Sequence, residues 1–176
     1  TERYLEECLL ATKNVDEQSV LNSPLMAYLL DYVQKSLTGF LSSLEGAIKI
    51  TEHPDGPYMY AKTLENDVEL IKGLIKVSGD YKLLSEQIEK VEFSRMPDKK
   101  DETVSSYKRE CVTDIRSDVK DSMKKLKEKF FFEEFSEMVL HEQYAGKALN
   151  TMFALANRYL EKIREAKQEK NIIDFN

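Results

Sequence analysis

Residues 133–170, EEFSEMVLHEQYAGKALNTMFALANRYLEKIREAKQEK, decide the fold of this chain. Mostly apolar side chains recur along the stretch at alternating intervals of three and four residues, which predicts one helix of roughly 35 residues, about 50 Å long. A domain of this size cannot bury such a helix along its whole length, so one end is expected to project. The repeat is carried by Phe135, Met138, Glu142, Ala145, Leu149, Met152, Ala156, Tyr159 and Ile163.

Earlier parts of the chain show the same helical period. Ser23 and Pro24 form an N-cap and a first helical position, and HPDGP at 53–57 is a turn. Helices are predicted at residues 1–12, 24–51, 58–75, 81–91 and 104–130. The fold class is therefore predicted as all-α: an elongated antiparallel helical bundle of five to six helices with a long C-terminal helix. Residues 1–176 are expected to form a single helical domain, with an internal linker at 93–104.

Charge is unevenly distributed along the chain. The net charge is −6, with charged residues at 33%, so the whole chain is not a generic binder of polyanions. Residues 1–94, 95–130 and 131–176 carry net charges of −7, +3 and −2. The middle segment is therefore locally basic.

Neither a metal site nor a nucleotide-binding loop is predicted. His53 and His141 lack ligand partners at helical spacing, and no Gly-rich phosphate loop occurs. Asp114, Asp118 and Asp121 share a helix face, but such acidic rows beside lysines are ordinarily solvated ion-pair faces. Cys8 and Cys111 have no CxxC spacing and the chain has no long apolar run, which favours a reduced, cytoplasmic protein.

A row of cations marks the helix predicted at 104–130. Spacings of seven, four, four and three residues place them in one stripe, and further cations lie in the linker. Such cations can each meet a backbone phosphate without reading sequence. Alternatively, they form a solvated face balanced by Glu110 and the aspartates, and composition alone favours this reading. The candidate DNA-binding residues are Arg95, Lys99, Lys100, Arg109, Arg116, Lys120, Lys124 and Lys127.

Aromatic residues are expected in the core more than on a base-stacking platform. This expectation covers Tyr58, Tyr60, Tyr107, Phe130 to Phe132 and Phe135.

Four stretches, in order, resemble AddA, the helicase component of the bacterial AddAB (RexAB) helicase–nuclease. They are HPDGPYMYAKTLENDVELI, VEFSRMPDKK, IRSDVKDSMKKLKEKFF and RYLEKIREAKQEKNIIDFN. The matching positions are Gly56, Pro57, Tyr60, Leu64 and Asp67, then Phe93, Arg95, Pro97 and Lys100, then Arg116 and Lys120, and finally Tyr159, Lys167, Asp174, Phe175 and Asn176. The resemblance covers about residues 55–176, and residues 1–50 carry no matching motif.

The resemblance implies the helical 1B insertion of a UvrD-like superfamily 1 helicase. The longer protein would be an ATP-dependent 3′→5′ DNA helicase with exonuclease activity, acting in double-strand break repair with an AddB-type nuclease partner. ATP and Mg²⁺ would bind outside this chain, which would hold no catalytic residue and would contact the DNA backbone independently of sequence. Thr113 departs from the pattern, because another cation is expected there. Asp174 and Phe175 would begin a motif that re-enters the motor domain, so residues 171–176 are expected to be its severed start.

Two other readings stay open. The seam on the last helix could pack against a neighbouring domain or a partner subunit, which predicts an exposed apolar strip and self-association. The chain could also be an unrelated helical protein with the same period and charge.

Overall fold

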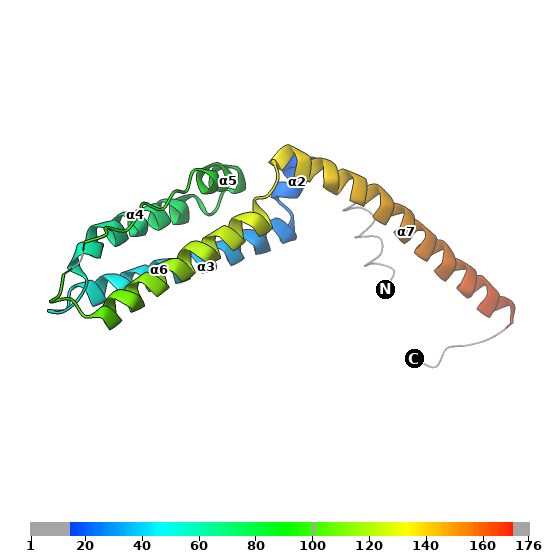
Figure 1. Ribbon diagram of the computed structural model, residues 1–176. Helices are drawn as coiled ribbons and strands as arrows, with labels where there is room; N and C mark the ends of the chain where they lie inside the picture. The colour runs from blue at the N-terminus through cyan, green and yellow to red at the C-terminus, as the bar shows by residue number, and fades with distance from the viewer. Residues whose placement is uncertain (1–14, 100, 171–176) are drawn as a thin grey trace. The chain divides into compact units, whose positions relative to one another are not determined.

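The computed structural model describes residues 15–99 and 101–170, and this part of the chain is all-α (Figure 1). The predicted fold class is confirmed: six α-helices and one short 3₁₀ helix occur among the described residues, and no strand does. The elements are α2 (Glu17–Leu21), α3 (Pro24–Thr51), η1 (Tyr58–Tyr60), α4 (Ala61–Val77), α5 (Tyr81–Glu89), α6 (Ser106–Phe130) and α7 (Phe135–Glu169). The helix predicted at residues 1–12 lies outside the described residues.

The chain divides into two compact units. Unit 1 comprises Thr1–Ser23 and Glu133–Asn176, and unit 2 comprises Pro24–Phe132. The described part of unit 1 holds α2 and α7, whereas unit 2 holds α3 to α6. The single domain expected over residues 1–176 stays a prediction.

Helix α3 is the centre of unit 2 and runs antiparallel to both α4 and α6, which it contacts (Figure 1). Pro24 opens this helix at a position where no backbone N–H is needed. The core of unit 2 consists of side chains that are almost completely buried, among them Val33, Leu37, Leu44, Leu64, Ile71, Leu84, Ile88, Val112 and Val119. Because all four α-helices of the unit contribute to this core, burial of these side chains supplies its main stabilisation.

The corner between α3 and η1 depends on a glycine. A Cβ added to Gly56 would lie 2.2 Å from the carbonyl oxygen of Ile50, so only glycine fits without displacing the backbone. The backbone N–H of Ser105 donates to the carbonyl oxygen of Asp55 at 2.9 Å. The turn predicted at 53–57 therefore also anchors the residue that caps α6.

Helix α5 is fixed to the C-terminal end of α6. Asp80 caps α5 by accepting a hydrogen bond from the backbone N–H of Leu83. The Tyr81 hydroxyl donates to the carbonyl oxygen of Phe130 at 3.0 Å, and its ring stacks on Phe131 with 5.3 Å between centroids. Between α5 and α6, the described residues 91–99 and 101–105 contain no helix.

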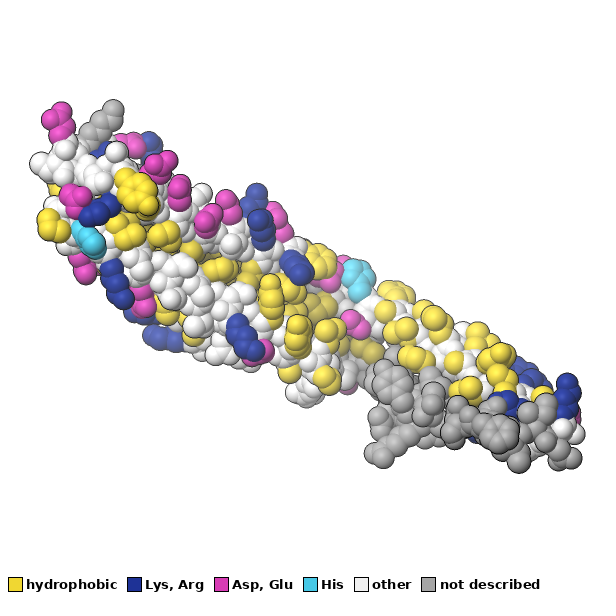
Figure 2. All heavy atoms as spheres, turned by 90° about the horizontal axis from the view of Figure 1, so that it is seen from below, with side chains coloured by type: hydrophobic (Ala, Val, Ile, Leu, Met, Phe, Trp, Pro, Cys, Tyr) yellow, Lys and Arg dark blue, Asp and Glu magenta, His cyan; other side chains and the backbone are white. Residues whose placement is uncertain are grey.

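Helix α7 confirms the predicted long C-terminal helix, with 35 residues from Phe135 to Glu169. Side chains at Met152, Leu155 and Tyr159 are more than 60% exposed, so the helix is not buried along its whole length. Figure 2 shows hydrophobic side chains gathered along one face of it. The buried positions, Val139 and Gly146, lie one residue beyond the predicted seam positions 138 and 145.

Helix α2 lies against α7 within unit 1. Asp16 and Ser19 form a reciprocal capping box at the start of α2. The Gln143 side chain donates to the carbonyl oxygen of Val15 at 2.9 Å, and Val20 is buried. Within residues 15–99 and 101–170, no helix is apolar over a length that would cross a bilayer.

Candidate nucleic-acid interface

Arg116 is the best-defined cation of α6, and it is buried. Its Nε donates to Asp67 Oδ2 at 2.6 Å, and its Nη2 donates to Asp67 Oδ1 at 3.2 Å. Nη2 also donates to the carbonyl oxygen of Ser94 at 2.7 Å, and the Phe93 ring centroid lies 5.9 Å from the guanidinium carbon. Arg116 is 4% exposed and Asp67 is 2% exposed.

The prediction that Arg116 belongs to an exposed row is therefore wrong. Helical spacing placed it correctly on the same side of the helix as Lys120, but residues 93 and 94 and helix α4 cover this position. A guanidinium already bound by a carboxylate and a carbonyl oxygen, and closed to solvent, cannot reach a phosphate. Arg116 instead joins α4, α6 and the segment after α5.

Arg109 and Lys127 lie at the margin of the same packed face. Both side chains belong to half-buried residues, and Lys127 Nζ donates to the carbonyl oxygen of Glu89 at 3.4 Å. Because residues 89–94 run past this side of α6, the predicted stripe is partly covered.

Lys120 and Lys124 are exposed one turn apart on α6. Lys124 Nζ lies 3.7 Å from Glu128 Oε1, and the two side chains are 74% and 63% exposed. An ion pair this exposed is weak, so it competes little with another anion for the ammonium group. These two lysines are the accessible members of the predicted row on α6.

The linker adds two exposed cations. Arg95 Nη2 lies 2.5 Å from Asp98 Oδ2, and both side chains are more than 80% exposed. Lys99 Nζ donates to the Tyr58 hydroxyl at 2.9 Å and lies 5.0 Å from the centroid of that ring. The Tyr58 hydroxyl in turn donates to Asp101 Oδ2 at 2.8 Å.

This linker network shifts two pKa values. The hydrogen bond to Tyr58 raises the pKa of Lys99, so its positive charge is secure at neutral pH. Hydrogen bonds from the side chain of Thr103, from Tyr58 and from the backbone of Thr103 lower the pKa of Asp101 to about 2. Lys100, Asp174 and Phe175 lie outside the described residues.

Acidic side chains border the exposed lysines. Glu110, Asp114, Asp118 and Asp121 are placed along α6, and all but Glu110 were predicted as one row; all four are exposed. Among the described residues, no three His, Cys, Asp or Glu side chains gather as a metal site requires. His141 Nδ1 lies 2.9 Å from Glu133 Oε2, and His53 Nδ1 lies 3.1 Å from Lys108 Nζ.

Sequence reasoning missed a groove between α3 and α6. It has a volume of about 270 Å³ and is lined by Tyr32, Ser36, Phe40, Ser122, Lys125, Leu126, Lys129 and Phe130. The expectation that aromatic residues lie in the core holds for Tyr60 and Phe131, but Tyr107 and Phe132 are about 70% exposed and Phe130 lines the groove. Lysines at 125 and 129, one turn apart, were the available signal.

Comparison with known proteins identifies longer relatives, although no family model matches the chain. Over 154 residues it is 29% identical to the A-type subunit of the ATP-dependent helicase/nuclease of Lachnoclostridium phytofermentans, covering 85% of this chain and 11% of the relative. The corresponding protein of Bacillus pumilus is 27% identical over 167 residues, or 94% of this chain and 14% of the relative. This chain is similar to AddA helicase/nuclease proteins. The resemblance predicted from the sequence is confirmed.

The similarity to AddA extends further than the motifs alone indicated. The corresponding helicase/nuclease protein of Moorella thermoacetica is 27% identical over 176 residues, which is 99% of this chain and 12% of that protein. Residues 1–50, which carry no recognisable motif, are thus included. The chain spans about 11–14% of the length of these relatives.

Several residues that carry the motif resemblance to AddA are structural here. Asp67, Phe93 and Arg116 meet in the buried cluster, and Gly56 makes the tight corner. The motifs therefore identify how unit 2 folds, whereas the exposed cations Arg95 and Lys120 are motif positions open to a partner.

Proposed function

We propose that this chain is a non-catalytic, DNA-contacting helical part of an AddA-type ATP-dependent helicase/nuclease, corresponding to the 1B insertion of its first motor domain. The observation that carries the proposal is the exposure of Lys120 and Lys124 on α6, next to the segment that bears Arg95. The similarity to AddA proteins over most of the chain supports it.

Backbone contact is the chemistry that these cations allow. Side chains one helical turn apart have Cβ atoms about 5–6 Å apart, which lets neighbouring ammonium groups approach successive phosphates. No base edge is read, so the contact is independent of sequence. The buried hydrogen bond from Arg116 to Ser94 holds the residue next to Arg95 on α6, and thereby keeps this cation near the exposed lysines.

The proposal extends to the longer protein. It would be a 3′→5′ DNA helicase with exonuclease activity that acts at double-strand breaks with an AddB-type nuclease partner. The ATP and Mg²⁺ that this activity requires would be bound by parts outside this chain, and the DNA contact proposed here needs neither.

Charge reversal at the exposed lysines tests the proposal. The chain with Lys120→Glu and Lys124→Glu is titrated against a fluorescent duplex by anisotropy, at salt concentrations from about 50 to about 200 mM. We expect the unchanged chain to bind duplexes of different sequence equally and to weaken steeply with salt. The variant should lose affinity by about tenfold or more, because two phosphate contacts become repulsive.

A matched control uses lysines on α4. Lys62→Glu with Lys76→Glu makes the same change in net charge at two exposed positions of unit 2. We expect this control to retain most of the affinity. Equal losses in the two variants, or no duplex binding by the unchanged chain, would show that the exposed row on α6 is not a DNA site.

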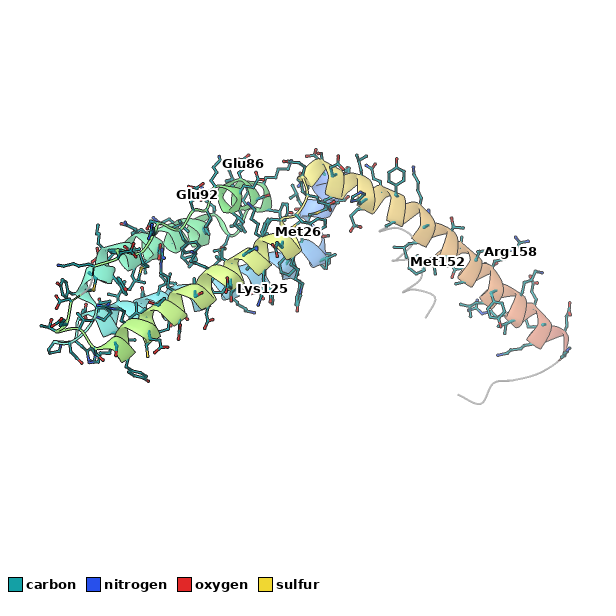
Figure 3. All side chains as sticks on the ribbon, viewed as in Figure 1. Met26, Glu86, Glu92, Lys125, Met152 and Arg158 are labelled. Carbon is teal, nitrogen blue, oxygen red and sulfur yellow. The ribbon has the colours of Figure 1, made fainter. Side chains whose placement is uncertain are left out.

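The exposed apolar side chains of α7 favour a second candidate function, a protein–protein interaction module. Met152, Leu155 and Tyr159 are each more than 60% exposed, and Met152 is marked on α7 in Figure 3. Such a strip would pack on a neighbouring domain or a partner subunit. Sedimentation of the chain without DNA tests this candidate: self-association that is lost in Met152→Glu supports it, and a monomer at all concentrations argues against it.

A further inference from the structure

The groove between α3 and α6 combines aromatic rings with lysines in one small concavity. One wall is a row on α3 formed by Tyr32, Ser36 and Phe40, which are spaced one turn apart. The other wall is α6, with Lys125, Lys129 and Phe130. The volume of about 270 Å³ is close to the lower end of ligand pockets, so the groove suits one small group rather than a long segment.

Flat apolar surface is available in this groove. The Tyr32 ring lies 5.4 Å from the Phe130 ring, tilted by 58°, and Tyr32 remains 45% exposed. Phe40 and Phe130 are half-buried, so each is held by the core while part of the ring stays accessible. Rings fixed in this way can accept another flat ring without losing side-chain entropy.

Positive charge is the second feature of the groove. Lys129 Nζ lies 5.1 Å from the Phe130 centroid and 6.0 Å from the Tyr32 centroid, which places the ammonium group beside the rings. Lys125, marked in Figure 3, is exposed one turn earlier on α6. Among the residues that the structure describes, no carboxylate lines this groove, so its charge is not neutralised from within.

A second groove of unit 2 provides the contrast. The groove between α3 and α4 is lined by Glu45, Glu65 and Glu69 together with Lys62 and Lys72, and Lys62 and Lys72 pair with the latter two glutamates. It has no aromatic ring in its lining. A basic groove with rings is thus a property of the α3–α6 side of the described unit.

We propose that the α3–α6 groove holds one unpaired nucleotide of single-stranded DNA, with its base on the Tyr32, Phe40 and Phe130 rings and its phosphate at Lys125 and Lys129. A base in a duplex is already stacked and cannot enter, whereas an unpaired base can stack on aromatic side chains and gain affinity without sequence readout. This inference rests on the proposed function in that the chain binds DNA. It uses a different side of α6, since Lys125 follows Lys124 by about 100° of helical rotation.

The test uses a fluorescent oligothymidylate of about ten nucleotides, a duplex of the same length, and an oligonucleotide of the same charge with abasic sites. Tyr32→Leu keeps apolar bulk but removes the ring. We expect it to lower the affinity for oligothymidylate about tenfold and to leave duplex affinity within about twofold. The unchanged chain should bind the abasic strand as weakly as Tyr32→Leu binds oligothymidylate.

Tyr28→Leu is the matched control, because Tyr28 is 70% exposed one turn away on α3 and does not line the groove. It should bind like the unchanged chain. If Tyr32→Leu proves unfolded by circular dichroism, Lys125→Gln with Lys129→Gln changes only exposed side chains and should weaken oligothymidylate binding more than duplex binding.

The outcomes separate this inference from the proposed function. Wild-type oligothymidylate affinity in both groove variants, equal binding of abasic and intact strands, or equal losses in Tyr28→Leu and Tyr32→Leu would overturn the groove proposal alone. Displacement of the strand from this groove by an acidic peptide of higher affinity would also overturn it, in favour of a peptide ligand. Loss of duplex binding in the Lys120 and Lys124 variant would still support the proposed function in each of these cases.

Discussion

Arg116 and Lys120 lie one turn apart on α6, yet the first is 4% exposed within an ion pair and the second is open to solvent. Both are cations on nearly the same side of one helix. The difference comes from what packs across them: Asp67 on α4 and the carbonyl oxygen of Ser94 enclose Arg116. Positive charge on α6 therefore has two uses, which are to hold unit 2 together and, as we propose, to contact DNA.

The buried side of this comparison predicts the largest effect. Asp67→Ala leaves the Arg116 guanidinium buried without its carboxylate, and we expect the free energy of unfolding to fall by about 3–5 kcal/mol. Urea denaturation followed by circular dichroism measures it. The control is Asp31→Ala, which removes the exposed partner of Lys35 and should cost less than about 0.5 kcal/mol. A loss below about 1 kcal/mol in Asp67→Ala would mean that the pair does not organise the unit.

The exposed side predicts a small and pH-dependent effect. Hydrogen bonds hold the pKa of Asp101 at about 2, below its ordinary value of 3.8. The ionised carboxylate therefore stabilises the folded chain above pH 3.8, and this contribution is lost as the pH falls through about 2. We expect Asp101→Asn to lower the melting temperature slightly at pH 5 and to converge on the unchanged chain near pH 2. Parallel melting curves at both pH values would contradict this account.

Local signals explain why the helices were predictable. Pro24 opens α3 and Gly56 closes the turn after it, and each acts through its own backbone geometry. The interval of three and four residues likewise predicted α7, although the buried positions lie one residue further along. That register depends on which element covers the helix, such as Gln143 bonding to Val15, and the period does not contain this information.

The candidate site was only partly predictable, because burial is set by distant residues. Asp67 lies 49 residues before Arg116, so nothing near Arg116 distinguishes it from Lys120. The α3–α6 groove was missed for the same reason, since Tyr32 and Lys129 meet only in the folded chain. Sequence spacing gives the direction of a side chain around its helix, and packing decides whether that direction is open.

The most direct test of these two uses is the slope of log affinity for duplex DNA against log salt concentration. Lys120→Gln with Lys124→Gln should reduce the slope by about two, close to 0.9 for each lost phosphate contact, and should leave the free energy of unfolding unchanged. Arg116→Lys, which keeps the charge but not the paired geometry, should lower stability and leave the slope as it is. An unchanged slope in the lysine variant, or a reduced slope in folded Arg116→Lys, would contradict the assignment of DNA contact to the exposed lysines.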